Sequence, residues 1–181
     1  EQVGCLSLSA DLQHLAAGTT YGAVHVFRTA EPQQRVTLDA SDGGVIRVAL
    51  SSDGRILVTS DDRNQVLLWR LPEYGEHVVP IAIDHSVAQG WSNCTMAIAP
   101  DGGFLVTAGG YAGPMARVWR LDDLSLVTTL SISPKLHNHV PLAFSADGSM
   151  LVTAGKTIKV WRTSDWSLLD RFENESFGTS S

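Results

Sequence analysis

One phrase occurs four times along this chain, and its last copy, Phe144 to Trp161, reads FSADGSMLVTAGKTIKVW. Each copy has an aspartate in a turn near its start and ends on an aromatic residue. The turn aspartates are Asp11, Asp53, Asp101 and Asp147, at intervals of 42, 48 and 46 residues. The closing aromatics are Phe27, Trp69, Trp119 and Trp161. Because self-similarity at such a period indicates a repeat architecture, each residue must be interpreted by its place in the repeat.

Apolar residues occupy fixed positions in each unit. The third and fifth residues before the turn aspartate are apolar in all four, and this alternation predicts a strand with one buried face. The fourth residue after it is always leucine, namely Leu15, Leu57, Leu105 and Leu151. The Asp-Gly turn between these two strands, present in three units, is a hairpin signal. A third strand ends at each aromatic, and a fourth apolar run follows it.

Each unit therefore predicts a four-stranded antiparallel sheet of about 40–50 residues, which is the period of a propeller blade. We expect blade units at residues 3–40, 44–84, 92–132 and 138–173, with a tail at 174–181. Such a sheet cannot bury two apolar faces alone, whereas radial stacking of neighbouring sheets covers them. The fold class predicted is all-β, a β-propeller with four visible blades.

The phrases FSADGSMLVTAGKTIKVW and IAPDGGFLVTAGG…ARVWR resemble those of WD-repeat β-propellers, and the resemblance covers nearly the whole chain. It implies a binding scaffold, because that family uses one architecture for many unrelated binding roles. It also implies a ring of seven or eight blades, completed by a strand from the other terminus. Four blades with no spare strand therefore predict an incomplete ring within a larger propeller.

The chain departs from the family pattern where side chains usually tie each blade together. The Gly-His dipeptide before the first strand is missing, and the Trp-Asp dipeptide is replaced by an aromatic residue followed by arginine. The positions of the family's turn aspartate hold Tyr21, Arg63, Gly113 and Gly155. We therefore expect that side-chain network to be absent and the blades to rely on packing and backbone hydrogen bonds.

An arginine follows the closing aromatic in every unit, and an acidic residue follows three positions later. The pairs are Arg28 and Glu31, Arg70 and Glu73, Arg120 and Asp123, and Arg162 and Asp165. One interpretation is an ion pair bracketing the turn between strands three and four, which contributes about 0–1 kcal/mol when exposed. The other is a rim of arginines, with Arg120 and Arg162 open to an acidic partner.

Four further residues are candidates for contacts with a protein partner. Trp91 lies outside the repeated columns, where it either packs at a blade seam or anchors a partner, since tryptophan is enriched at such anchors. Tyr111 and Met115 lie in the long GGYAGPMAR connection, which is either a plain loop or a contact loop on a rigid scaffold. Trp166, in the last hairpin turn, is a second candidate anchor.

Composition argues against several classes of function. The formal net charge of −6 disfavours non-specific phosphate binding, so no nucleic acid is expected. No apolar run approaches the length of a membrane span, so no membrane insertion is expected. Cys5 and Cys94 fit buried thiols of a reducing compartment, which favours the cytoplasm, with a cytoskeletal or nuclear setting still open. His137 and His139 form a His-x-His pair without a suitably spaced third ligand, so neither metal nor cofactor is predicted.

The sequence has no nucleophile elbow, catalytic-triad context or Walker loop. We therefore predict a non-enzymatic scaffold that binds other proteins through blade loops and edges within a larger assembly. Those partners include chains or segments that supply the remaining blades. The alternative is a regulatory or sensor propeller attached to an enzyme elsewhere in the full-length polypeptide. A propeller enzyme or sugar binder ranks third, because positions near the inner strands, such as Ala97 and Ala143, are small.

Overall fold

The computed structural model describes residues 2–63, 65–71, 81–83, 94–108, 115–132 and 140–173. These residues form strands and turns without any helix, and so they contain no helix able to cross a membrane. The strands make four separate antiparallel sheets of four strands each, and every sheet takes its strands from consecutive chain segments. The predicted fold class, an all-β chain of four-stranded propeller blades, is confirmed, and the ring of blades is not closed.

The first sheet contains β1 (Val3–Leu8), β2 (His14–Thr19), β3 (Ala23–Arg28) and β4 (Glu31–Asp39). The second contains β5 (Val45–Leu50), β6 (Ile56–Asp61), β7 (Val66–Arg70) and β8 (Ile81–Ile83). The third contains β9 (Thr95–Ile98), β10 (Phe104–Ala108), β11 (Met115–Arg120) and β12 (Leu126–Ser131). The fourth contains β13 (Leu142–Phe144), β14 (Met150–Ala154), β15 (Thr157–Arg162) and β16 (Leu168–Glu173).

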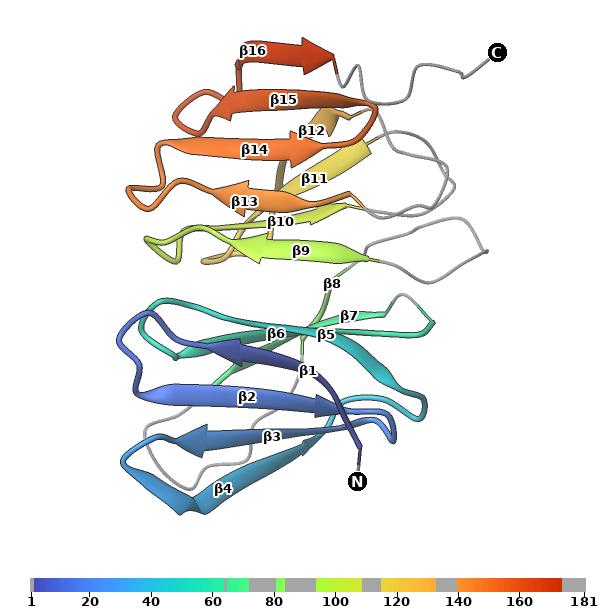
Figure 1. The fold of residues 1–181 in the computed structure, drawn as a ribbon, viewed down its shortest axis with the longest axis vertical. Helices are drawn as coiled ribbons and strands as arrows, with labels where there is room; N and C mark the ends of the chain where they lie inside the picture. The colour runs from blue at the N-terminus through green and yellow to red at the C-terminus, as the bar shows by residue number, and fades with distance from the viewer. Residues whose placement is uncertain are drawn as a thin grey trace.

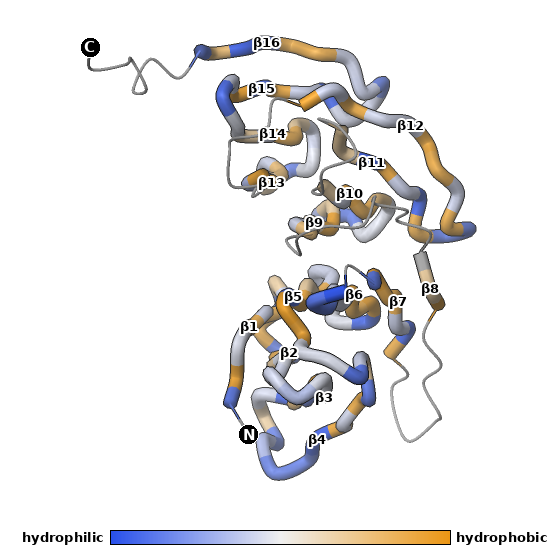
Figure 2. Tube along the Cα trace, turned by 90° about the vertical axis from the view of Figure 1, so that its right-hand side faces the viewer, coloured by the Kyte–Doolittle hydropathy of each residue, from blue (hydrophilic) through white to orange (hydrophobic). Residues whose placement is uncertain are grey.

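The four sheets are stacked in the order of the sequence (Figure 1). Viewed from the side, they fan out, with β1, β5, β9 and β13 on the inner side and β4, β8, β12 and β16 outside (Figure 2). Along the inner side, β5 contacts both β1 and β9, and β9 contacts β13. Each sheet therefore presses against its neighbours, as radial stacking requires.

An apolar core fills each of the three spaces between neighbouring sheets. In the middle core, Val58 and Leu68 of the second sheet pack with Leu105 and Trp119 of the third. The leucine column is completely buried in three sheets, at Leu57, Leu105 and Leu151. The repeated leucines are therefore the residues that pack one sheet onto the preceding one.

The turn after the first strand of each sheet is closed by its aspartate. In the β13–β14 turn, Asp147 Oδ1 accepts hydrogen bonds from the Ser145 hydroxyl at 2.5 Å and from the Ser149 N–H at 3.1 Å. The Ser145 hydroxyl oxygen also accepts the N–H of Met150 at 3.0 Å. Three of the four turns share this serine–aspartate arrangement, with Ser9 and Asp11, Ser51 and Asp53, and Ser145 and Asp147. Each of these turns is therefore held by hydrogen bonds among its own residues.

The residue after each of these aspartates adopts a left-handed conformation. Gly54, Gly102 and Gly148 have φ values of 69°, 73° and 71°, and Leu12 reaches φ 60° in the first turn. A side chain at such φ values costs roughly 1–2 kcal/mol, which explains the glycine in three units. The hairpin that the Asp-Gly signal predicts is present in all four sheets, although the first has no glycine there.

Candidate interaction surface

Turns from all four sheets lie along one side of the fan, at the left of Figure 1. We call this surface the turn rim and define it by residues 9–13, 51–55, 99–103, 120–125, 145–149 and 162–167. Neighbouring turns are hydrogen-bonded to one another. The N–H of Asp11 donates to the Ser52 carbonyl at 3.2 Å, and the Ser52 hydroxyl donates to the Pro100 carbonyl at 2.7 Å. The first three turns therefore form one continuous row.

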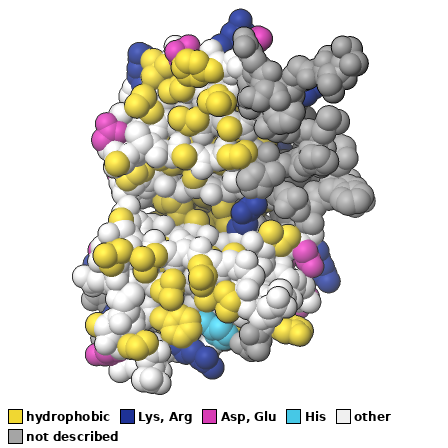
Figure 3. All heavy atoms as spheres, in the orientation of Figure 1, with side chains coloured by type: hydrophobic (Ala, Val, Ile, Leu, Met, Phe, Trp, Pro, Cys, Tyr) yellow, Lys and Arg dark blue, Asp and Glu magenta, His cyan; other side chains and the backbone are white. Residues whose placement is uncertain are grey.

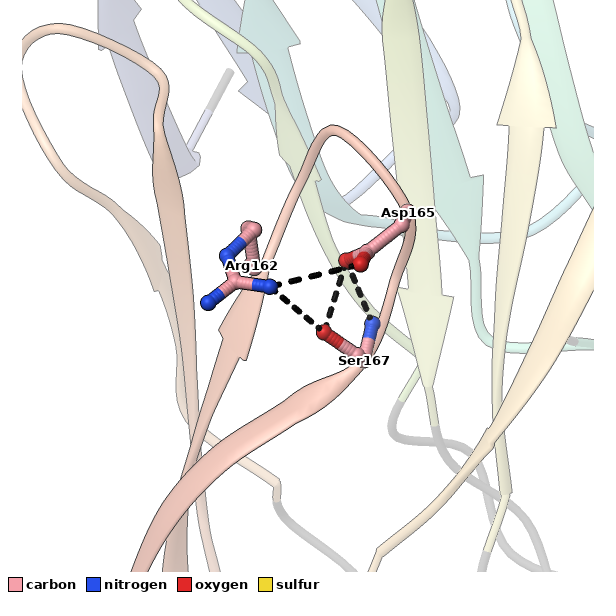
Figure 4. Close-up of polar contacts among 3 residues, drawn as sticks. All are labelled: Arg162, Asp165 and Ser167. Carbon is pink, nitrogen blue, oxygen red and sulfur yellow. Dashed lines mark hydrogen bonds and ion pairs between the residues drawn. The ribbon is translucent and has the colours of Figure 1, made fainter.

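The β15–β16 turn shows how the rim presents charge (Figure 4). Asp165 Oδ1 accepts both the N–H and the hydroxyl of Ser167, at 3.0 and 2.7 Å. Arg162 Nη1 lies 3.4 Å from Asp165 Oδ2, and both side chains are about half exposed. Trp166 stands between the two bonded residues at φ 56°. The predicted ion pair across this turn is present, and one face of it is open to solvent.

The other arginines of the repeated pattern make different contacts. Arg70 Nη2 donates to the carbonyl oxygens of Leu121 and Asp122 at 2.8 and 3.3 Å, so it links the second sheet to the third. Arg120 is exposed, and its charge adds to the Ser125 hydrogen bonds that lower the pKa of Asp123. Glu73 lies outside the described residues. The arginine after the aromatic residue therefore forms a local ion pair in the fourth sheet and links two sheets when it belongs to the second.

Hydrogen bonds keep the rim carboxylates ionised. At Asp147 the Ser145 hydroxyl, followed by the N–H and hydroxyl of Ser149, lowers the pKa from 3.8 to about 2. The same kind of serine contact is the largest cause of a lowered pKa at Asp11, Asp53, Asp123 and Asp165. The rim therefore carries fixed negative charges interspersed with arginines.

Acid is expected to destabilise the chain through these turns. The folded pKa of Asp147, about 2, lies below its ordinary 3.8, so the unfolded state binds the proton more readily. The stability that this difference supplies is present above pH 3.8 and is lost as the pH falls through about 2. Thermal melts between pH 5 and pH 2 should show a falling Tm, with a shallower fall in Asp147→Asn. Parallel pH profiles for the two proteins would contradict this explanation.

The closing tryptophans form buried hydrogen bonds that the sequence analysis did not predict. Each indole Nε1–H donates to a threonine hydroxyl on the adjacent strand. The pairs are Trp69 and Thr59 at 3.1 Å, Trp119 and Thr107 at 2.9 Å, and Trp161 and Thr153 at 3.1 Å. The first sheet has Phe27 and Ala17 at the same positions, and neither side chain can make this bond. Threonine thus occurs only in the units that carry tryptophan, and this correlation was a usable sequence signal.

Side chains other than those of the family pattern thus support the sheets in addition to packing and backbone hydrogen bonds, and the second sheet shows this most clearly. Asp61, only 5% exposed at the end of β6, accepts a hydrogen bond from the Ser41 hydroxyl at 2.8 Å. Its Oδ1 also accepts the N–H groups of Arg63 and Gln65, at 3.0 and 2.7 Å. The family pattern directed attention to the position of Arg63, whereas Asp61 closes this turn.

Three of the predicted contact residues lie together at the turn rim. Arg162 ends β15, Trp166 lies in the β15–β16 turn, and Arg120 ends β11 in the adjacent sheet. The partly buried Trp166 ring meets Phe104 edge to face, with centroids 5.3 Å apart, and Phe104 pairs with Arg120 in the β10–β11 ladder. Phe104 thus links Arg120 to Trp166 across two sheets, and Arg162 begins the turn that carries Trp166; we group these three residues as one patch.

The remaining predicted contact residues are not part of that patch. Met115, 50% exposed, begins β11 and lies roughly 17 Å along the strand from Arg120, given a rise of about 3.3 Å per residue. Trp91 and Tyr111 lie outside the described residues, and so do the histidines His137 and His139. A role of any of these residues in partner binding stays a prediction.

Neither a metal centre nor a reactive thiol is visible in the described part of the chain. No group of three or more His, Cys, Asp or Glu residues there could hold a metal ion. Cys5 and Cys94 are free thiols, and burial raises the pKa of both, that of Cys94 to about 12. At neutral pH Cys94 is therefore a protonated core residue.

Comparison with known protein families gives one match. The family described as WD domain, G-beta repeat, matches residues 32–70. The matched segment runs from β4 of the first sheet to the last residue of β7 in the second. A search of curated proteins found no match. Repeats of this kind generally mediate protein–protein interactions and are generally non-catalytic.

Proposed function

Since a WD repeat and four four-stranded sheets place this chain in a WD-repeat propeller family, we propose that it is a non-enzymatic scaffold for protein–protein interaction. It binds partner proteins through the turn rim, as one part of a larger assembly. We also propose a cytoplasmic location, which two free thiols support.

The observation that carries this proposal is that hydrogen bonds within the chain hold the turns of the rim. Each turn is closed by its own aspartate, and adjacent turns are joined through Asp11, Ser52 and Pro100. A surface held in its binding geometry loses little conformational entropy on association, so more of its contact energy appears as affinity. Exposed side chains on such a rigid scaffold are suited to recognition.

The patch of Arg120, Arg162 and Trp166 is the part of the rim that we assign to partner contact. Arg162 contacts Asp165 and Ser167 through Nη1 alone, and its Nη2 and Nε have no hydrogen-bond partner among the described residues, so they can meet an acidic partner group. Trp166, four residues later, supplies an aromatic ring that packs on Phe104 of the third sheet. Arginine and tryptophan are the side chains most enriched among residues that dominate binding energy.

The test compares charge reversals on and off the rim in the full-length protein. Arg120→Glu and Arg162→Glu alter the patch, and Arg171→Glu on β16, also exposed, is the matched control with the same charge change. Quantitative affinity purification should show at least one protein reduced tenfold or more by both rim variants and retained by the control. Equal Tm values would verify folding. The same set of partners from all variants would refute rim binding.

A further inference from the structure

Inside the stack, each sheet offers one face to the sheet before it and the other to the sheet after it. The face toward the preceding sheet carries the leucine column and the closing aromatic, such as Leu105 and Trp119. The face toward the following sheet carries the residues next to these in sequence, such as Val106 and Val118. The first and fourth sheets each keep one such face without a neighbour among the described residues.

The unpaired face of the first sheet is apolar and exposed. It carries Leu6 and Leu8 on β1, with Leu15 and Phe27 beside them on β2 and β3. Leu6 is 63% exposed and Leu8 49%. The residue equivalent to Leu8 in the second sheet, Leu50, is only 9% exposed because the first sheet covers it.

The unpaired face of the fourth sheet is apolar as well. Its residues are Val152, Ile158, Val160 and Phe172. Phe172, opposite Ile158 in the β15–β16 ladder, is 51% exposed. The residues at the same ladder position in the first and third sheets, Leu38 and Leu130, are 5% and 2% exposed because a following sheet covers them.

These two faces are therefore the two halves of an interface that the chain already forms three times. Both unpaired faces are also oriented toward the same side of the molecule. Figure 1 shows the first and fourth sheets face on, at the bottom and top of the view, and Figure 3 shows hydrophobic side chains gathered over both. One partner that approaches from that side can cover both faces at once.

We propose that this partner is a second copy of the chain. A two-fold axis parallel to β1, β5, β9 and β13 places the fourth sheet of each copy on the first sheet of the other. The two identical contacts close an eight-sheet ring, in keeping with the closed symmetry of most homo-oligomers. Closure removes both exposed apolar faces, which are otherwise an association liability. This interface meets the turn rim at Arg162, which lies opposite Met150 in the β14–β15 ladder. The proposal does not depend on the function proposed for the rim.

The charges on the two faces favour this pairing over contacts between like faces. Asp170 lies opposite Val160 on the fourth sheet, and Arg35 lies opposite Phe27 on the first. Both are exposed residues of outermost strands. Arg162, opposite Met150 and two residues beyond Val160, lies at the turn end of the same fourth-sheet face. Fourth sheet against first sheet brings Asp170 and Arg35 to the same interface, whereas fourth against fourth brings together two copies of Asp170 and two of Arg162.

The area that the two contacts would bury is also sufficient for a stable dimer. With strands about 4.8 Å apart and about 3.3 Å per residue, a four-stranded face of five residues covers roughly 300 Å². The closed ring buries four such faces, roughly 1,200 Å² in all, which is at the lower end of the range for stable specific interfaces.

Sedimentation equilibrium of the 181-residue chain at micromolar concentrations tests the proposal. The chain of 19.5 kDa should sediment with twice that mass. Leu6→Lys on the first face and Phe172→Lys on the fourth should each weaken the dimer at least tenfold. Leu12→Lys, an equally exposed leucine in the β1–β2 turn outside both faces, should leave the dimer intact. Circular dichroism would check folding, with Leu8→Lys and Met150→Lys replacing any variant that unfolds.

Each alternative outcome is decisive. A wild-type chain that stays monomeric overturns the proposal, and so do open-ended oligomers that grow with concentration. A dimer weakened by only one of the two face substitutions would mean that like faces pair, and this too would overturn the eight-sheet ring. Loss of the dimer together with unchanged partner capture would leave the function of the turn rim standing, so the two proposals fail separately.

Discussion

Replacement of Leu105 by alanine is expected to lower the free energy of unfolding by about 2–5 kcal/mol. Leu105 is completely buried in the core between the second and third sheets, where it packs with Val58 and Trp119. Truncation removes buried methyl groups and leaves a cavity that two rigid sheets cannot easily close. Urea denaturation, followed by tryptophan fluorescence, measures the change.

Leu126→Ala provides the matched control. Leu126 lies on β12 in the same sheet but is 49% exposed, so the same chemical change should alter stability by no more than about 0.5 kcal/mol. Similar losses from the two substitutions would mean that the leucine column does not hold the sheets together.

The second large effect is expected at the buried pair formed by Trp161 and Thr153. Each of Trp161→Phe and Thr153→Val leaves the partner's polar atom buried without its 3.1 Å hydrogen bond, which costs about 1–3 kcal/mol. Removal of both groups leaves no orphaned atom, so the double variant should lose less than the sum of the single losses. Chemical denaturation of the four proteins in this cycle gives the coupling energy, about 0.5–3 kcal/mol for residues in contact.

Thr129→Val, at an exposed position on β12, is the comparison for that cycle. Its effect should simply add to that of Trp161→Phe. If Thr153→Val were equally additive, the indole would not depend on the threonine hydroxyl. The first sheet is a natural counterpart of the double variant, because Phe27 and Ala17 occupy these two positions there.

The stacking of the sheets could be predicted from the sequence because apolar residues recur at the same positions in every unit. A leucine at the same distance from each turn aspartate needs the same burial, and four copies in register leave few other arrangements. The Asp-Gly turns could be predicted for a local reason, since a residue next to the aspartate must reach φ near 70°. Both signals depend on short-range chemistry within one unit.

Contacts between units were harder to predict because they depend on which sheets become neighbours. The sequence paired Arg70 with Glu73, which lies outside the described residues, and gave no sign that Arg70 donates to the carbonyl oxygen of Leu121 in the next sheet. Trp166 packs on Phe104, and no feature of either segment indicates the other. The patch of Arg120, Arg162 and Trp166 thus exists only after the third and fourth sheets have stacked.

The network of Asp61 was missed for a different reason. A pattern taken from the family fixed the expected position of the turn aspartate, and Arg63 stood there instead. The physical requirement is only that a carboxylate reach the free N–H groups of the turn, and Asp61 meets it from the last residue of β6. Donor and acceptor accounting along the turn would have found it.

Native-state labelling of Cys94 tests most directly the claim that the sheets are held together by burial between neighbours. This thiol is 2% exposed in the core between the second and third sheets, whereas Cys5 is only half-buried. Pulsed alkylation with mass spectrometry should show Cys94 reacting no faster than the chain unfolds globally, and Cys5 reacting sooner. If Cys94 reacts in native buffer at the rate seen in the urea-unfolded chain, the second and third sheets are not packed together, and the account is wrong.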